Sequence, residues 1–126
     1  MRERIVIPTA DDRGLDAKLS EHFGRAPYFT VIELDEGGNI ANIHSNPNTS
    51  EHFGGHGRPP DRILKLHPNA VIVYEMGIRA LSIFQQARVA VLRANANNVR
   101  KVIEAYKRDE LEELTEGCRH ARHSES

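Results

Sequence analysis

The chain has 126 residues and a mass of 14.2 kDa, the size of one ordinary domain. Its 17 Lys and Arg residues nearly balance its 18 Asp and Glu residues, so no excess of positive charge indicates nucleic-acid binding. A single Cys excludes a disulfide framework within the chain, and the first apolar run, Ile5 to Ile7, is too short for a signal peptide or a membrane span. We therefore expect a cytoplasmic protein with no nucleic-acid or membrane partner.

The first half of the chain predicts three strands. Ile5 to Ile7 is a β-branched run that we expect to end at Pro8 and to lead into a surface loop. Two strand-like segments, 28–34 and 39–44, follow. The glycines of the intervening sequence Asp-Glu-Gly-Gly can supply the positive φ of a tight turn, so these two strands should pair antiparallel.

The second half alternates helices and strands. A helix is expected from Pro60 to before Pro68, an apolar strand over 70–74, a helix opened by Gly77, and a strand over 89–92. Asn95 or Asn97 is expected to cap a last helix, whose apolar residues recur at the spacing of one buried face. This order predicts one three-layer α/β domain over residues 1–115, with a mixed sheet of about five strands, an N-terminal antiparallel hairpin and flanking helices. Residues 116–126 lack an apolar anchor and are expected to form a flexible tail.

The pentapeptide Ser-Glu-His-Phe-Gly occurs twice, at residues 20–24 and 50–54, in segments that we expect to be loops. Each copy places an imidazole, His22 or His52, beside a carboxylate and an aromatic ring. Its glycine would let the backbone approach a ligand closely. Two interpretations stay open, namely a ligand-binding segment, or a capping or turn segment whose histidine faces water.

Two further groups of residues suit metal ligation. His52 and His56 lie four positions apart in a glycine-rich stretch without periodicity, which predicts a long loop that is poorly ordered without ligand. Near the C-terminus, Cys118, His120 and His123 offer a thiolate and two imidazoles within six residues. These residues are candidate ligands of zinc, iron or an iron–sulfur cluster. The alternative for the tail is a solvated segment that binds no metal.

The positions of the acidic residues disfavour hydrolytic chemistry. A two-metal nuclease or phosphotransferase on a mixed sheet usually carries carboxylates on central strands, and the first strand here has none. Asp11, Asp12 and Asp16 follow it in a loop, and Glu33 is expected to face solvent. No phosphate-binding loop is evident either, because the Gly/His stretch lacks the Lys and Ser or Thr that end such a motif. These observations count against a hydrolase, a nuclease or a phosphotransferase.

Gly77 marks a possible anion site. Because it stands where a strand passes into a helix, the free N–H groups of the next three residues could face the crevice at the strand's carboxyl end, and Arg79 would add charge. Residues 95–98 stand at the equivalent exit of the next strand, and two helix N-termini on one crevice would suit a multiply charged anion. The alternative is a tight turn that requires glycine for its geometry alone.

Taken together, these segments resemble the dinitrogenase iron–molybdenum cofactor biosynthesis family. The resemblance covers nearly the whole chain: the Ile-Val-Ile-Pro strand, residues 19–29, the Gly/His loop, residues 69–80, the last helix and the Cys/His tail. Its most specific parts are His-Phe-Gly-Arg-Ala-Pro at 22–27 and Gly-Ile-Arg-Ala at 77–80. The chain differs from the family at residues 95–98, where members usually carry a glycine-rich turn, and at Glu75-Met76, and both differences would reshape the ligand crevice.

The resemblance implies a ribonuclease-H-like fold and a carrier that binds an iron–sulfur or iron–molybdenum cofactor precursor without catalysing a reaction. The cofactor-binding residues would be His22, Arg25, Gly77 and Arg79. Metal ligands would come from His22, His52, His56, Cys118, His120 and His123. The partner would be a protein that donates or accepts the metallocluster, and the carrier itself a monomer or a weak homodimer. Two alternatives stay open, a mononuclear zinc or iron protein and a metal-free interaction module.

Overall fold

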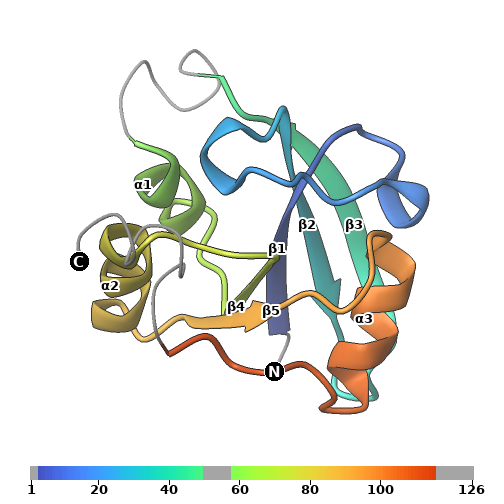
Figure 1. Ribbon diagram of the computed structural model, residues 1–126. Helices are drawn as coiled ribbons and strands as arrows, with labels where there is room; N and C mark the ends of the chain where they lie inside the picture. Colours follow the sequence, from blue (N-terminus) through green and yellow to red (C-terminus); the bar gives the residue numbers. More distant parts are fainter. Residues whose placement is uncertain (1–2, 50–57, 116–126) are drawn as a thin grey trace.

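The computed structural model describes residues 3–49 and 58–115, and Figure 1 shows their arrangement. The elements in chain order are β1 (Glu3–Thr9), the 3-10 helices η1 (Gly14–Asp16) and η2 (Phe23–Arg25), β2 (Tyr28–Leu34), β3 (Ile40–Pro47), α1 (Pro59–Leu64), β4 (Ala70–Val73), α2 (Ile78–Gln86), β5 (Ala90–Arg93) and α3 (Val99–Lys107). Among these residues, no helix has both the length and the apolar character needed to cross a bilayer.

The five strands form one mixed sheet in the order β3-β2-β1-β4-β5, which confirms the predicted mixed five-stranded α/β architecture. β2 pairs antiparallel with both β1 and β3, whereas β4 pairs parallel with both β1 and β5. In the turn between β2 and β3, Gly38 has a φ of +81°. The Asp35 carboxylate accepts from the N–H groups of Gly37 and Asn39, both at 2.9 Å, and so fixes this turn.

Helices cover both faces of the sheet and give three layers (Figure 1). Successive strand residues point to opposite faces and therefore fill two separate cores. On the α1/α2 face, Val6 of β1 belongs to the same buried cluster as Ile63 of α1 and Phe84 of α2. On the α3 face, Ile5 of β1 packs in a cluster with Val102 of α3. The apolar spacing read from the sequence of the last helix thus corresponds to its buried side.

Pro8 does not end β1, contrary to the prediction. The strand continues to Thr9, and Pro8 lies opposite Phe29 in β2. The carbonyl of Pro8 accepts from the N–H of Ser20 at 3.0 Å, so its backbone groups face away from β2. The missing N–H therefore removes no hydrogen bond from the β1–β2 pair, which allows the strand to pass through the proline.

The two outer strands differ in how their free edges are covered. Along β5, Arg93 N donates to Glu112 O and Leu114 N donates to Val91 O, both at 2.8 Å, so residues 112–114 occupy that edge. The Leu114 side chain is buried in the core of the α1/α2 face. Along the outer side of β3, no segment within 3–49 or 58–115 makes comparable backbone hydrogen bonds.

Candidate functional site

The candidate site lies at the edge of the sheet where β1, β4 and β5 end and β2 begins. At this edge the chain leaves β1 for β2, which lies on one side of the β1–β4 pair. It leaves β4, through α2, for β5, which lies on the other side. Such a change of direction opens a crevice outside the carboxyl ends of parallel strands, and ligands of open α/β sheets commonly bind there. The loops that leave the two strands carry His22, Arg25, Gly77 and Arg79.

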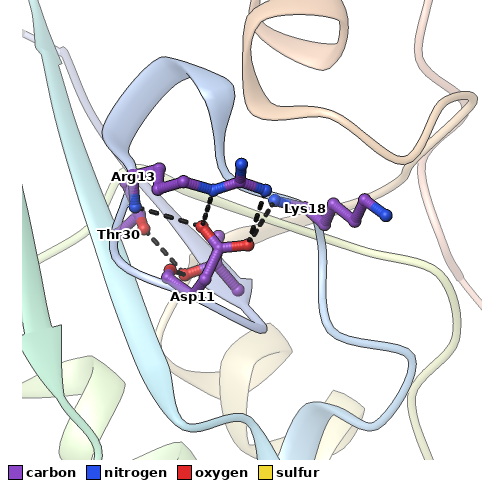
Figure 2. A network of polar contacts seen from close by, with 5 residues as sticks. Asp11, Arg13, Lys18 and Thr30 are labelled. Atoms are coloured by element: carbon purple, nitrogen blue, oxygen red, sulfur yellow. Dashed lines mark hydrogen bonds and ion pairs between the residues drawn. The ribbon is translucent and has the colours of Figure 1, made fainter.

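A polar network holds the loop after β1 in place (Figure 2). The Asp11 carboxylate accepts from the backbone N–H of Arg13 at 3.1 Å and of Lys18 at 3.3 Å, and it pairs with the Arg13 guanidinium at 3.3 Å. Partial burial raises the pKa of Asp11, but the hydrogen bonds from Arg13 and Lys18 outweigh this effect and leave the pKa below its usual value. Beneath the network, the hydroxyls of the fully buried Thr9 and Thr30 lie 2.9 Å apart.

The same loop crosses the end of the sheet and reaches the connection before α3. Ala10 N donates to Lys18 O at 2.8 Å, and Leu19 N donates to Asn97 O at 3.0 Å. The loop is therefore anchored on both sides before it reaches the first Ser-Glu-His-Phe-Gly copy. Sequence reasoning predicted a surface loop here but did not predict these anchors, because they depend on which strands become neighbours.

His22 immediately precedes η2, Arg25 is the last residue of η2, and both are exposed. The hydroxyl of Ser20 donates to His22 O at 3.0 Å, so the segment is a side-chain-stabilised turn, as one of the two interpretations expected. The His22 ring makes no hydrogen bond to any described residue and stays available to a ligand. Gly24 has an ordinary φ, and a Cβ added there would lie 3.8 Å from Pro59 Cγ, so the fold does not require this glycine.

Aromatic packing joins η2 to α2. The rings of Phe23 and Phe84 meet edge to face with centroids 6.1 Å apart and an interplanar angle of 78°. On the other side of the loop, the charge of Glu21 reaches Tyr74, the residue after β4. The pKa of the Tyr74 hydroxyl is raised, first by burial and second by Glu21. The structure thus brings the histidine-bearing loop beside the β4–α2 connection, although no hydrogen bond joins His22 or Arg25 to Gly77 or Arg79.

The N-terminus of α2 has open N–H groups. Gly77 is its N-cap with φ −65° and ψ 157°, a conformation that any residue adopts, and a Cβ added to Gly77 would meet nothing within 4 Å. The backbone N–H groups of Ile78, Arg79 and Ala80 have no hydrogen-bond acceptor among the described residues. The backbone geometry and the packing at this turn therefore do not by themselves require glycine.

The expected second open helix N-terminus is not found. Asn98, and neither Asn95 nor Asn97, caps α3, and its side-chain oxygen accepts from Lys101 N at 3.3 Å. In addition, Val99 N donates to Ala17 O at 3.1 Å. The N–H groups of Val99 and Lys101 thus already have acceptors, so the start of α3 lacks the run of three open donors found at the start of α2.

Sequence reasoning missed a bridge between η2 and α1. Asn48, just after β3, donates from its side chain to Ala26 O at 2.8 Å and from its backbone to Pro27 O at 2.9 Å. Its side-chain oxygen accepts from Arg62 Nη1 at 2.7 Å, and the buried Nε of Arg62 has no partner among the described residues. No sequence motif marks this pair, since its meaning depends on α1 lying against η2.

The carboxylate of Glu33 in β2 forms a structural ion pair. Glu33 does not face solvent as expected, because its side chain is only 14% exposed and pairs with Arg4 at 3.0 Å. Arg4 in turn donates to Leu66 O at 2.8 Å, which links β1 and β2 to the segment that follows α1.

Within residues 3–49 and 58–115, no three His, Cys, Asp or Glu residues group as a metal site. The predicted ligands His52, His56, Cys118, His120 and His123 lie outside the described residues, as do the tail and the expected Gly54 to Gly57 loop.

Comparison with known proteins gives consistent results. A family model described as dinitrogenase iron–molybdenum cofactor matches residues 3–109. An uncharacterized protein of Methanocaldococcus jannaschii, MJ0580, is 32% identical over 114 residues, covering 88% of this chain and 91% of that protein. The crystal structure of the protein PH0822 aligns with a TM-score of 0.74 at 28% identity, covering 89% of this chain and 96% of the other.

The apo form of the orange protein of Desulfovibrio gigas has the same fold, with a TM-score of 0.67 at 18% identity over 90% of this chain and 94% of that one. The family match spans every strand and helix of the sheet and both loops of the candidate site. This chain therefore belongs to the dinitrogenase iron–molybdenum cofactor family.

Proposed function

We propose that this protein carries an anionic iron–sulfur or iron–molybdenum-type metallocluster, or a precursor of one, between a donor and an acceptor protein. Binding takes place at the carboxyl edge of the sheet, without chemical conversion of the cargo. Membership of the family supports a metallocluster as the cargo. The cytoplasmic location expected from the sequence is part of this proposal.

The observation that carries the proposal is the open N-terminus of α2 behind Gly77. Three backbone donors without acceptors and the positive end of the helix dipole favour a negatively charged ligand. A side chain at position 77 would fit the backbone and the space, so the fold gives no reason of its own for glycine. A ligand that approaches the backbone closely supplies that reason.

The surrounding residues suit the same cargo. Arg25 and Arg79 are exposed and form no ion pair with any described residue, so both are available to an anion. His22 offers an imidazole from a loop that is held in position by hydrogen bonds on either side of it, from Leu19 to Asn97 and from Asn48 to Ala26. Exposed ligands on a surface loop also suit a carrier, since cargo held there can be transferred to a second protein.

The remaining predicted ligands stay predictions from the sequence. His52 and His56 belong to the second Ser-Glu-His-Phe-Gly segment and its glycine-rich continuation. Asn48 and Pro59, which lie close to the two ends of that stretch in the sequence, both contact the η2 region. We include His52 and His56 in the proposed ligand set on this basis, and Cys118, His120 and His123 on their ligand chemistry alone.

Anaerobic reconstitution with iron and sulfide, with and without molybdate, tests the proposal. We expect sulfide-dependent charge-transfer absorption together with several iron atoms per chain by metal analysis. Gly77→Val should strongly reduce this loading, because its side chain would fill the space before the α2 donors. Ala41→Val is the control, since it adds side-chain volume at an exposed position of β3 that lies at the other end of the sheet.

Each other outcome would point to a different function. One iron or zinc ion per chain, with no dependence on sulfide, would replace the cluster carrier by a mononuclear metal protein. No retention of either metal would leave the metal-free interaction module. Full loading of Gly77→Val would remove the N-terminus of α2 from the site while leaving the carrier function intact.

A further inference from the structure

Within residues 3–49 and 58–115, no strand pairs with the outer side of β3. Natural sheets protect such edges with charged residues, short strands, prolines or covering segments. This chain covers its other edge, β5, with residues 112–114. In contrast, β3 is eight residues long and contains no Asp, Glu, Lys or Arg, although 28% of the whole chain is charged.

The ladder between β2 and β3 shows which backbone groups are free. Asn48 N donates to Pro27 O in the same register that pairs Asn46 with Phe29 and His44 with Val31. Opposed residues of an antiparallel pair alternate between exchanging and not exchanging hydrogen bonds. The backbone groups of His44 and Asn46 therefore face β2, whereas those of Ile43 and Ser45 face outward.

Nothing else in the described residues occupies these outward groups. Gly14 of η1 approaches Ile43, since a Cβ added there would lie 3.8 Å from Ile43 Cδ1. That approach is to a side chain on the α3 face, and no described backbone group hydrogen-bonds to Ile43 or Ser45 from the outer side. The usable edge is limited at one end by the register shift opposite Glu33 and Leu34, and at the other by Pro47, which has no N–H.

We propose that a second copy of this chain pairs with β3 edge to edge, antiparallel across a twofold axis, to form one continuous ten-stranded sheet. In the register that sets Ile43 opposite Ser45 of the other copy, both residues exchange both hydrogen bonds, giving four in all. A register centred on Ser45 would instead oppose Ile43 to Pro47 and leave the Ile43 carbonyl unpaired. The first register therefore satisfies every outward group of the two residues.

The absence of charge on β3 favours a second copy as the occupant. Identical strands that meet at a twofold axis bring like residues together, and like charges would repel there. In the proposed register His44 faces His44 of the other copy, and Asn42 faces Asn46. The interface has few hydrogen bonds and little apolar surface, so the dimer should be weak and form at high protein concentration.

Sedimentation equilibrium of the full chain from micromolar to millimolar concentration tests the association. Ser45→Pro removes an outward N–H and no bond to β2, and it should raise the dimer dissociation constant at least about tenfold, because two of four hydrogen bonds are lost. Ser45→Ala keeps the N–H and should associate like the parent. His44→Lys places two like charges across the axis and should abolish the dimer, while the neutral His44→Gln should keep it.

Cross-linking tests the register. In a Cys118→Ser background, His44→Cys should form a disulfide-linked dimer with a thiol oxidant, because opposed residues of a non-hydrogen-bonded pair lie within disulfide reach. Asn42→Cys, opposed to Asn46, should not. A chain that stays monomeric at millimolar concentration would overturn the proposal. A dimer that tolerates both Ser45→Pro and His44→Lys would also overturn it, since another surface would then mediate association. Neither outcome bears on cargo binding at the carboxyl edge.

Discussion

The ring of Phe23 lies edge to face against the ring of Phe84, with centroids 6.1 Å apart. Phe84 is fully buried in the core of the α1/α2 face, whereas Phe23 belongs to the loop that carries His22 and Arg25. One aromatic contact thus joins the candidate ligand loop to the helix whose N-terminus is open. This contact helps to fix the relative position of the two halves of the site.

Phe23→Ala should therefore affect both stability and cargo binding. Loss of the partly buried ring and of its aromatic pair should lower the free energy of unfolding by about 2 kcal/mol. Urea denaturation measures this loss, and reconstitution with iron and sulfide measures retention. Phe23→Leu keeps apolar volume and should lose less stability. An unchanged midpoint for Phe23→Ala would show that the contact does not hold the loop.

His22→Ala should separate binding from folding. The His22 side chain is exposed and has no hydrogen-bond partner among the described residues, so the apo-protein should keep its melting temperature. Cargo affinity should fall at least about tenfold if the imidazole is a ligand, since even outer-shell losses commonly cost that much. His44→Gln, at another exposed histidine, is the control. Equal affinity of the His22→Ala variant and the parent would return His22 to a purely structural turn role.

Gly77→Ser should stabilise the apo-protein. Gly77 is the N-cap of α2, its backbone suits any residue, and an added Cβ has open space around it. A serine hydroxyl can accept from an N–H group of the first turn, and its side chain reduces the freedom of the unfolded chain, so the free energy of unfolding should rise by about 0.4–1 kcal/mol. Thermal denaturation of the apo-protein checks the sign. A lower melting temperature would mean that position 77 needs glycine for folding, contrary to its role as an open ligand contact.

The sequence predicts those features of the fold that depend on neighbouring residues, and it fails for those that depend on residues far apart in the chain. Ile5 to Ile7 and the apolar run after Asn69 predict buried strands, because their burial depends on local pattern. The cap of α3 was mispredicted because several nearby asparagines are equally suited, and Ala17, which meets the start of the helix, is about 80 positions away. The open space at Gly77 is likewise a property of tertiary packing.

Asp11 should make stability depend on pH in the acid range. Its pKa in the folded state is lowered by hydrogen bonds from Arg13 and Lys18, against the opposing effect of burial. The stabilisation is therefore present above the unfolded pKa of about 3.9 and is lost as the pH falls through the folded value. Asp11→Asn should be less stable than the parent at neutral pH, and the difference should shrink below about pH 4. Urea denaturation at several pH values measures this difference in stability, and Asp12→Asn, at an exposed position, is the control. A difference that is constant with pH would contradict a lowered pKa of Asp11 in the folded state.

The residues before the tail provide the control for its removal. Leu114 is buried, and Arg93 and Val91 exchange hydrogen bonds with the segment around it. Truncation after Glu110 removes this cover from β5 and the Leu114 side chain from the core, so we expect a clear loss of thermal stability, by about 2 kcal/mol or more. Truncation after Gly117 keeps the segment intact.

Truncation after Gly117 should leave the melting temperature of the apo-protein nearly unchanged, because the sequence of the tail lacks an apolar anchor and should contribute little burial. Cargo affinity should nevertheless fall by more than the 10- to 100-fold typical of an outer-shell loss, if Cys118, His120 and His123 are ligands. Binding by the full chain should weaken as the pH drops through about 6.5, since a protonated imidazole cannot ligate, and the truncated chain should show less of this dependence. Reconstitution with iron and sulfide across this pH range measures both effects.

Equal affinity of the two chains would remove the tail from the site and leave the histidines of the two Ser-Glu-His-Phe-Gly segments as the candidates. Loss of apo stability on this truncation would instead indicate that the tail is packed structure.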